Sequence, residues 1–163
     1  MRAVSDTGPL HYLILLDYVD ILQALFSEVA VPETVRDELA HPNTPDAARR
    51  WMTAPPTWVA VHPVRPDMLA GIDAALDPGE RAALALAVEQ QPGLVLMDDR
   101  AGVAAAHAHG FIVTGTLGLL VRAARRGLLD LPAALDALRR TNLRWTPSLR
   151  ARVLAEHAKS RAQ

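Results

Sequence analysis

The stretch Leu76–Gly102, LDPGERAALALAVEQQPGLVLMDDRAG, decides the fold of this chain. Alanine, leucine and valine fill almost all of Arg81–Val88, so the segment predicts a helix that is apolar nearly all round and therefore buried. The continuous apolar run Leu94–Met97 is typical of a buried parallel strand. Asp98 and Asp99 follow directly, at the point where that strand leaves the sheet. In open α/β sheets this is the edge at which ligands bind.

Short apolar strands alternate with helical patterns along the rest of the chain. Strands are expected at Arg2–Ser5, Glu28–Val31, Trp58–Val61 (an edge strand), Leu94–Met97 and Phe111–Val113. Such alternation implies a parallel sheet covered by helices on both faces. We therefore expect an α/β protein, a three-layer α/β/α domain with a mostly parallel central sheet of four to five strands.

Composition limits the possible classes of protein. A chain of 163 residues with 50% hydrophobic content is long enough for one domain with a substantial core, so 1–163 is expected to be a single domain. Cysteine is absent, which excludes disulfides, thiolate zinc sites and cysteine nucleophiles. The N-terminus has no signal-peptide pattern, and the apolar run Leu10–Leu16, cut by Asp17, is too short to cross a membrane. We expect a cytoplasmic protein without a membrane partner.

The net charge of −1 conceals an asymmetry between two parts of the chain. Residues 1–120 hold 7 arginines and 15 acids, a net charge of −8, whereas residues 121–163 hold 10 basic residues and 3 acids, a net charge of +7. An acidic body suits a cation, and a basic tail suits an anionic polymer or an acidic partner. An unevenly charged solvated surface is the simpler explanation.

Four acids occupy positions that a parallel sheet would bring together. Asp6 and Asp98 each end a strand, Glu80 begins the helix before the second of these strands, and Glu38 lies on the helix after Glu28–Val31. Each has a local explanation as well: helix caps for the aspartates, a capping box for Glu80, and a surface position for Glu38. Carboxylates clustered at one edge would repel one another unless a cation neutralised them. With oxygen ligands only, the expected cation is Mg²⁺ or Mn²⁺, which activates water and stabilises the charge on a phosphodiester during cleavage.

Four short motifs in this order resemble the PIN-domain nucleases. They are Val4-Ser5-Asp6-Thr7, the Val35–Leu39 helix, Gly79-Glu80 with its alanine- and leucine-rich continuation, and Leu94–Asp98. The sequence is most similar to a PIN-like branch whose members carry the motifs Leu-Asp-x-Gly-Glu, Asp-Asp-Arg and Gly-Thr-Leu-Gly in this order. The resemblance covers residues 1–127, which would form the catalytic core, and leaves 128–163 as a C-terminal helical extension.

The resemblance implies a function and a set of site residues. It implies a metal-dependent endoribonuclease, the toxin of a toxin–antitoxin pair, with RNA, a small cognate antitoxin and a second copy of the chain as partners. The catalytic acids carried over by position are Asp6, Glu38, Glu80 and Asp98. The implied ligands of Mg²⁺ or Mn²⁺ are Asp6, Glu80 and Asp98, with Asp99 as an alternative or second ligand.

Further residues are candidates for substrate contact. Thr114 and Thr116 flank a glycine after the last strand, where their hydroxyls would hold a phosphate or simply cap the next helix. Arg100 is expected to pair with an acid near the site or to face substrate phosphate. Residues Arg122, Arg125 and Arg126 end the helix that begins at Thr116, and we expect them to contact RNA.

The tail also contains features that suit more than one use. Arg144-Trp145 is a planar pair able to stack on an unpaired base. The leucines Leu131, Leu135 and Leu138 have a helical spacing that suits a homodimer seam or an antitoxin groove.

Two other classes of protein also place acids at such an edge or keep the same fold. Aspartate-based phosphotransfer domains need a lysine from a later strand, but the single lysine, Lys159, lies near the C-terminus. A catalytically silent PIN-like module that binds nucleic acid or protein is the other alternative.

Overall fold

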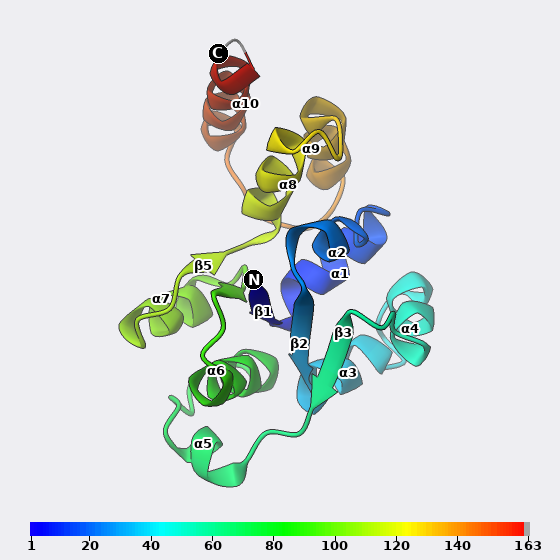
Figure 1. Cartoon of the computed structure of the whole chain (residues 1–163). Coiled ribbons are helices and arrows are strands. Elements are labelled where there is room, and N and C mark those ends of the chain that lie inside the picture. The colour runs from blue at the N-terminus through cyan, green and yellow to red at the C-terminus, as the bar shows by residue number, and fades with distance from the viewer. Residues whose placement is uncertain (162–163) are drawn as a thin grey trace. The chain divides into compact units, whose positions relative to one another are not determined.

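Five parallel strands form one sheet at the centre of this chain, whose computed structural model describes residues 1–161. The strands are β1 (Arg2–Ser5), β2 (Glu28–Pro32), β3 (Val59–His62), β4 (Leu94–Leu96) and β5 (Val113–Thr114). Their order across the sheet is β3-β2-β1-β4-β5, and every neighbouring pair is parallel (Figure 1). The predicted α/β class and parallel five-stranded sheet are confirmed, and β3 is an edge strand as expected.

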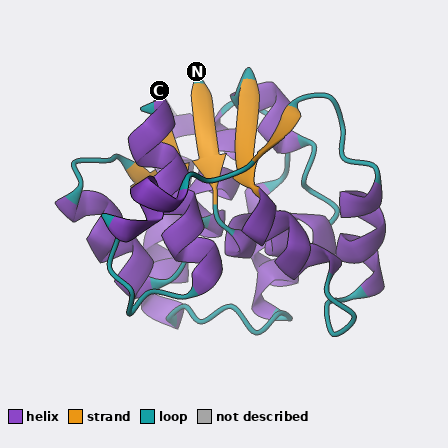
Figure 2. Ribbon diagram, turned by 90° about the horizontal axis from the view of Figure 1, so that it is seen from below, coloured by secondary structure: helices purple, strands orange, loops and turns teal. Residues whose placement is uncertain are grey.

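Helices connect the strands and continue beyond them. They are α1 (Thr7–Leu15), α2 (Ile21–Leu25), α3 (Glu33–Ala40), α4 (Asp46–Thr53), α5 (Pro66–Ala70), α6 (Pro78–Gln90), α7 (Arg100–Ala108), α8 (Thr116–Arg125), α9 (Leu131–Arg139) and α10 (Pro147–Arg161). Figure 2 shows the strands among the helices that flank them. Contacts divide the chain into two units, Met1–Thr116 and Leu117–Gln163, so the division falls in the first turn of α8 and ahead of residue 127.

One buried cluster of the first unit lies between a face of the sheet and helices α6 and α7. Val4, Ala30 and Val95 from three adjacent strands lie in one buried cluster with Leu84 and Leu86 of α6. Strands β1 to β3 progress in one direction from β1, whereas β4 and β5 lie on its other side. Because crossovers between parallel strands are right-handed, α1–α4 cover the opposite face from α6 and α7.

Helix α6 is buried all round because it contacts elements on several sides. It lies against β1, β2, α3, α5 and α7, and every residue from Ala82 to Ala87 is buried. Its start is encoded locally: Pro78 occupies the first helical position, and Glu80 accepts a hydrogen bond from the backbone N–H of Asp77. It ends at Gln91, which adopts a left-handed conformation with φ of 49°.

The remaining differences from the sequence prediction are small. The helical pattern at 67–74 forms only the short α5, because Gly71 and a turn follow it. The last strand is β5, two residues later than the expected start, since Phe111 donates its backbone N–H to Ala106 O and closes the end of α7 instead. The chain turns shortly after α1, where Asp17 adopts a left-handed conformation with φ of 60°. Among residues 1–161 no helix combines the length and the apolar character that a membrane crossing needs.

The second unit contains the rest of α8 together with α9 and α10. Asp130 caps α9 by accepting the backbone N–H of Ala133 at 3.0 Å, and α9 contacts α10. The leucines of α9, Leu131, Leu135 and Leu138, are buried within the chain. These side chains are therefore not exposed for contact with a partner, because they already pack inside the chain.

Candidate metal centre

The candidate site lies at the carboxyl edge of the sheet, where the strand order reverses. β1 and β4 are parallel neighbours with Ser5 opposite Leu96, and the backbone N–H of Asp6 donates to Leu96 O at 2.9 Å. Asp6 and Asp98 therefore leave the same edge of two adjacent strands. A crevice of this kind, between strands whose connections run in opposite directions, is where open α/β sheets bind ligands.

A pocket of about 280 Å³ opens beside Asp6, and acidic side chains dominate it. Its lining residues are Asp6, Thr7, Glu38, Asp77, Pro78, Gly79 and Glu80. Four of these seven residues are carboxylates, and none is basic. The negative charge of the pocket is therefore not balanced by any side chain that lines it.

Burial makes Asp6 a poor place for a bare negative charge. Its residue is only 6% exposed, and although it precedes α1 its carboxylate does not cap that helix. Desolvation, together with the neighbouring charges of Glu80 and Glu38, raises the pKa of Asp6 to about 7, while backbone hydrogen bonds from Thr7 and Gly8 lower it. A helix cap alone therefore does not explain the burial of this residue or its closeness to Glu80 and Glu38.

Glu80 has a second role besides capping α6. It is 5% exposed, and desolvation raises its pKa to about 7, with the charge of Asp99 as the next cause. A methyl group on Gly102 of α7 would lie 3.1 Å from the Glu80 carboxyl carbon, so this carboxylate is packed against α7. The capping box and the acidic site share one side chain.

Glu38 reaches the pocket from α3. The hydroxyl of Thr7 donates a short hydrogen bond to Glu38 Oε2. The approach of α6 is equally close, since a methyl group on Gly79 would lie 2.5 Å from the same oxygen. A larger residue at this position would therefore force the Glu38 carboxylate to move away from its present place beside Asp6.

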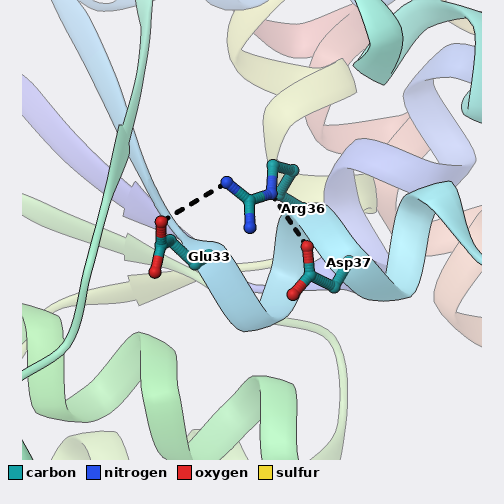
Figure 3. Close-up of polar contacts among 3 residues, drawn as sticks. All are labelled: Glu33, Arg36 and Asp37. Carbon is teal, nitrogen blue, oxygen red and sulfur yellow. Dashed lines mark hydrogen bonds and ion pairs between the residues drawn. The ribbon is translucent and has the colours of Figure 1, made fainter.

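The other acids of α3 are neutralised locally and do not belong to the site. Arg36 donates to Asp37 Oδ1 at 2.8 Å and to Glu33 Oε1 at 3.4 Å (Figure 3). All three side chains are substantially exposed to solvent. Within α3, the acid whose position distinguishes it is Glu38.

Asp98 is held by two donors from the N-terminus of α8. Its Oδ1 accepts the backbone N–H of Thr116, and its Oδ2 accepts the Thr116 hydroxyl, both at 2.7 Å. Desolvation raises the pKa of Asp98, while these two hydrogen bonds lower it. The carboxylate also approaches the first turn of α1, since a methyl group on Gly8 would lie 3.1 Å from Oδ2. Tyr12 of α1 responds to this carboxylate: desolvation, and then the charge of Asp98, raises its pKa.

The remaining predicted residues of the first unit lie at the start of α7 and at the end of β5. Asp99 is exposed and caps α7 by accepting the backbone N–H of Ala101 at 2.8 Å. Arg100 is exposed in the first turn of α7, and Thr114 is half-buried in β5. The basic residues Arg122, Arg125 and Arg126 are exposed on or next to α8 and belong to the second unit.

The donor chemistry of the pocket fits a hard divalent cation. Carboxylate oxygens are the ligands that Mg²⁺ and Mn²⁺ prefer, and the raised pKa values of Asp6 and Glu80 indicate charge that a cation would balance. Within residues 1–161, no three carboxylate or imidazole side chains are already arranged closely enough to hold a metal ion. The acids instead accept hydrogen bonds from Thr7, Asp77 and Thr116. Binding a cation would require these side chains to turn toward it.

Two pocket residues were not singled out from the sequence. Asp77 was visible only as a helix cap, and Thr7 only as part of the Asp-Thr motif. Their positions are the signal that the sequence offers: Thr7 directly follows Asp6, and Asp77 lies three residues before Glu80. Residues adjacent to site acids at helix starts are natural donors and acceptors to them.

Comparisons with known proteins agree with this geometry. A family model described as a PIN domain (DUF3368) matches residues 2–159. Among solved structures, the fold is similar to a PilT N-terminus domain protein from the hyperthermophilic archaeon Sulfolobus solfataricus P2, with a TM-score of 0.54 over 76% of this chain and 93% of that chain. At 16% identity this similarity shows the fold alone. No curated protein matches the chain.

The family match spans nearly the whole sequence, including the four acids and the threonine that holds Asp98. PIN domains are generally nucleases and typically use divalent metals. The chain belongs to the PIN-domain family.

Proposed function

We propose that this protein is a metal-dependent endoribonuclease that hydrolyses RNA phosphodiester bonds at the Asp6 pocket. One observation carries the proposal: four carboxylates line a pocket at the carboxyl edge of the sheet without a basic side chain among them. The carboxylates of such a pocket repel one another when no ion is bound, and binding a cation is the simplest function that explains their arrangement.

The roles proposed for the residues follow from their burial and contacts. A bound Mg²⁺ or Mn²⁺ would supply Lewis-acid stabilisation of the phosphodiester and lower the pKa of a water molecule. Asp6 and Glu80, which line the pocket, would hold the cation together with Asp98 and Asp99, which lie outside its lining. Glu38, held by Thr7, would accept a proton from the attacking water.

The substrate side of the proposal rests on the last strand and helix α8. Thr116 orients Asp98 through two hydrogen bonds, which hold both carboxylate oxygens of Asp98 toward α8. Thr114 at the end of β5 and the exposed Arg100 at the start of α7 would contact the RNA backbone. The exposed arginines of α8, Arg122, Arg125 and Arg126, would add phosphate contacts.

We further propose that the nuclease is the toxin of a toxin–antitoxin pair that acts in the cytoplasm. A small antitoxin would bind it, and two copies would pair. The motifs shared with toxin nucleases support this role, and the basic tail supports an anionic ligand. Co-expression tests it: the protein alone should arrest growth, and the product of an adjacent small gene should relieve the arrest. Normal growth with the active nuclease expressed alone would contradict the toxin role.

Cleavage of single-stranded RNA by the purified protein tests the activity. We expect cleavage with Mg²⁺ or Mn²⁺, none with EDTA, and a loss of at least about a hundredfold in Asp98→Asn, because one removed carboxylate weakens both metal binding and charge stabilisation. Asp46→Asn, which alters an exposed acid outside the pocket, is the matched control. Cleavage that survives Asp98→Asn or EDTA would contradict the proposal.

The second candidate is a PIN-like module that binds without cleaving. One observation favours it: the acids accept protein hydrogen bonds and do not form a three-ligand group within residues 1–161. The same assay separates the two, because a silent module would bind RNA or protein and show no metal-dependent cleavage. Replacing Arg122, Arg125 and Arg126 by alanine should reduce the salt dependence of RNA binding in either case. An unchanged slope would remove α8 from the RNA path.

A further inference from the structure

A second pocket lies within the basic second unit, and the proposed catalysis does not use it. It has a volume of about 280 Å³ and is lined by Arg139, Trp145, Thr146, Pro147, Arg150 and Ala151. It is therefore built from the end of α9, the loop that follows, and the first turn of α10. Its size is at the lower end of small-ligand sites, roughly 300–1,000 Å³, so it suits one compact group.

One arginine of this pocket is held in place. Arg150 donates to Asp136 Oδ1 of α9 at 2.5 Å, which ties α10 to α9. Its Nε is buried and, in the part of the chain that the structure describes, has no hydrogen-bond partner. A buried donor without an acceptor is costly, and an acceptor bound in the pocket is the simplest way to satisfy it.

The other arginine remains available to a ligand. Arg139 is exposed in the last turn of α9, and no ion pair of the described residues involves it. An exposed guanidinium next to a fixed one suits a group with several acceptor oxygens, such as a phosphate.

Trp145 supplies a flat apolar surface at the same place. Its side chain is half-buried, and among residues 1–161 its ring stacks on no other aromatic ring. The next residue, Thr146, fixes the loop by accepting the backbone N–H of Leu149 at its hydroxyl, at 3.2 Å, at the start of α10. The indole is therefore presented by an anchored loop.

The charge of the whole unit points to an anionic ligand. From Leu117 onward the sequence has 10 basic residues and 3 acids. The pocket also lies at the N-terminus of the 15-residue helix α10, which adds a positive dipole end.

We propose that this pocket binds one nucleotide of a single-stranded RNA, with its base stacked on Trp145 and its phosphate at Arg139 and Arg150. Aromatic platforms combined with basic side chains are the usual means of holding unpaired bases. The inference rests on the proposed function only in taking RNA as the polymer. It assigns the second unit the task of anchoring the strand apart from the metal centre.

Binding of a short fluorescein-labelled oligoadenylate, followed by anisotropy in EDTA, tests the proposal without cleavage. Trp145→Leu should weaken binding by about 5- to 150-fold, the range for losing one base stack, and Trp145→Phe should recover most of it. Arg139→Ala should weaken binding severalfold more than Arg140→Ala, which removes the same charge from the neighbouring exposed position outside the pocket lining. Quenching of tryptophan emission by the oligonucleotide should be lost in Trp145→Phe, because Trp51 and Trp58 lie in the first unit.

Several results would overturn the proposal. Equal losses from Arg139→Ala and Arg140→Ala would indicate diffuse charge attraction in place of a pocket. Undiminished binding and quenching in the Trp145 variants would remove the base stack. Displacement of the RNA by polyglutamate, with no effect of Trp145→Leu on either ligand, would indicate an acidic protein partner.

The outcome is independent of the nuclease proposal. RNA binding through Trp145 in a protein that cleaves nothing would sustain this inference and end the proposed activity. Metal-dependent cleavage with unaltered oligonucleotide affinity in all Trp145 and Arg139 variants would support the proposed activity and contradict this inference.

Discussion

Replacing Asp6 by asparagine should stabilise the metal-free protein at neutral and alkaline pH. Asp6 is 6% exposed, and burial with the charges of Glu80 and Glu38 raises its pKa from 3.8 to about 7. The folded protein therefore binds a proton more tightly than the unfolded chain between these two values. Its free energy of unfolding must fall as the pH rises from about 4 to about 7, and the penalty is complete above that range.

The size of the effect follows from the difference between the two pKa values. A difference of about 3 pH units corresponds to at most about 4 kcal/mol, because each unit is worth about 1.4 kcal/mol. Asparagine carries no charge and keeps nearly the same volume. We expect Asp6→Asn to gain roughly 1–4 kcal/mol at about pH 8 and almost nothing at about pH 4.

Urea unfolding in EDTA at these two pH values measures the gain. The control is Asp20→Asn, an exposed acid at the start of α2 whose side chain makes no capping hydrogen bond. The same urea unfolding with saturating Mg²⁺ or Mn²⁺ in place of EDTA measures the stabilisation by metal. A cation at a hundred times its dissociation constant stabilises the folded protein by about 2.7 kcal/mol, and this gain should vanish in Asp6→Asn.

Two results would refute the reasoning. If the difference between wild type and Asp6→Asn is the same at both pH values, Asp6 is not strained by its burial. If the variant keeps the full stabilisation by metal, the cation binds without Asp6.

Two other substitutions test the packing of the acids. Gly79→Ala should displace the Glu38 carboxylate, whose Oε2 would lie 2.5 Å from the new methyl group, and should abolish cleavage with little change in stability, because the end of this flexible side chain can move aside. Gly71→Ala, with its nearest atom at 3.6 Å, should leave cleavage unchanged, and equal activity in both variants would contradict the argument. Thr116→Val should remove one of two donors to Asp98, lower cleavage at least tenfold, and cost about 1–3 kcal/mol by urea unfolding near pH 7. Thr116→Ser, which retains the hydroxyl, should restore both cleavage and stability. If it does not, the losses in Thr116→Val arise from altered packing.

The site residues taken from the sequence remain predictions of function, but several of their positions could be anticipated. Asp6 and Asp98 each follow an apolar strand, and parallel neighbours necessarily end at one edge. By contrast, the charges that add to the raised pKa of Asp6 come from Glu38 on α3 and Glu80 on α6, so no local pattern could reveal them. The arginines of α8 and their relation to the pocket likewise depend on tertiary placement.

The sequence by itself determined the order and type of nearly every element, because these depend on short-range signals. The apolar run of Leu94–Met97 and the capping residues from Asp77 to Glu80 specify a strand and a helix start without reference to the rest of the chain. The tertiary structure decided which strands pair, since apolar strands have no local label for a neighbour. It also decided which acids meet: Thr7 reaches Glu38 across 31 positions of sequence, and Thr116 reaches Asp98 across 18. Contacts at such separations exist only once the sheet and the packing of α3 and α6 have brought their ends together.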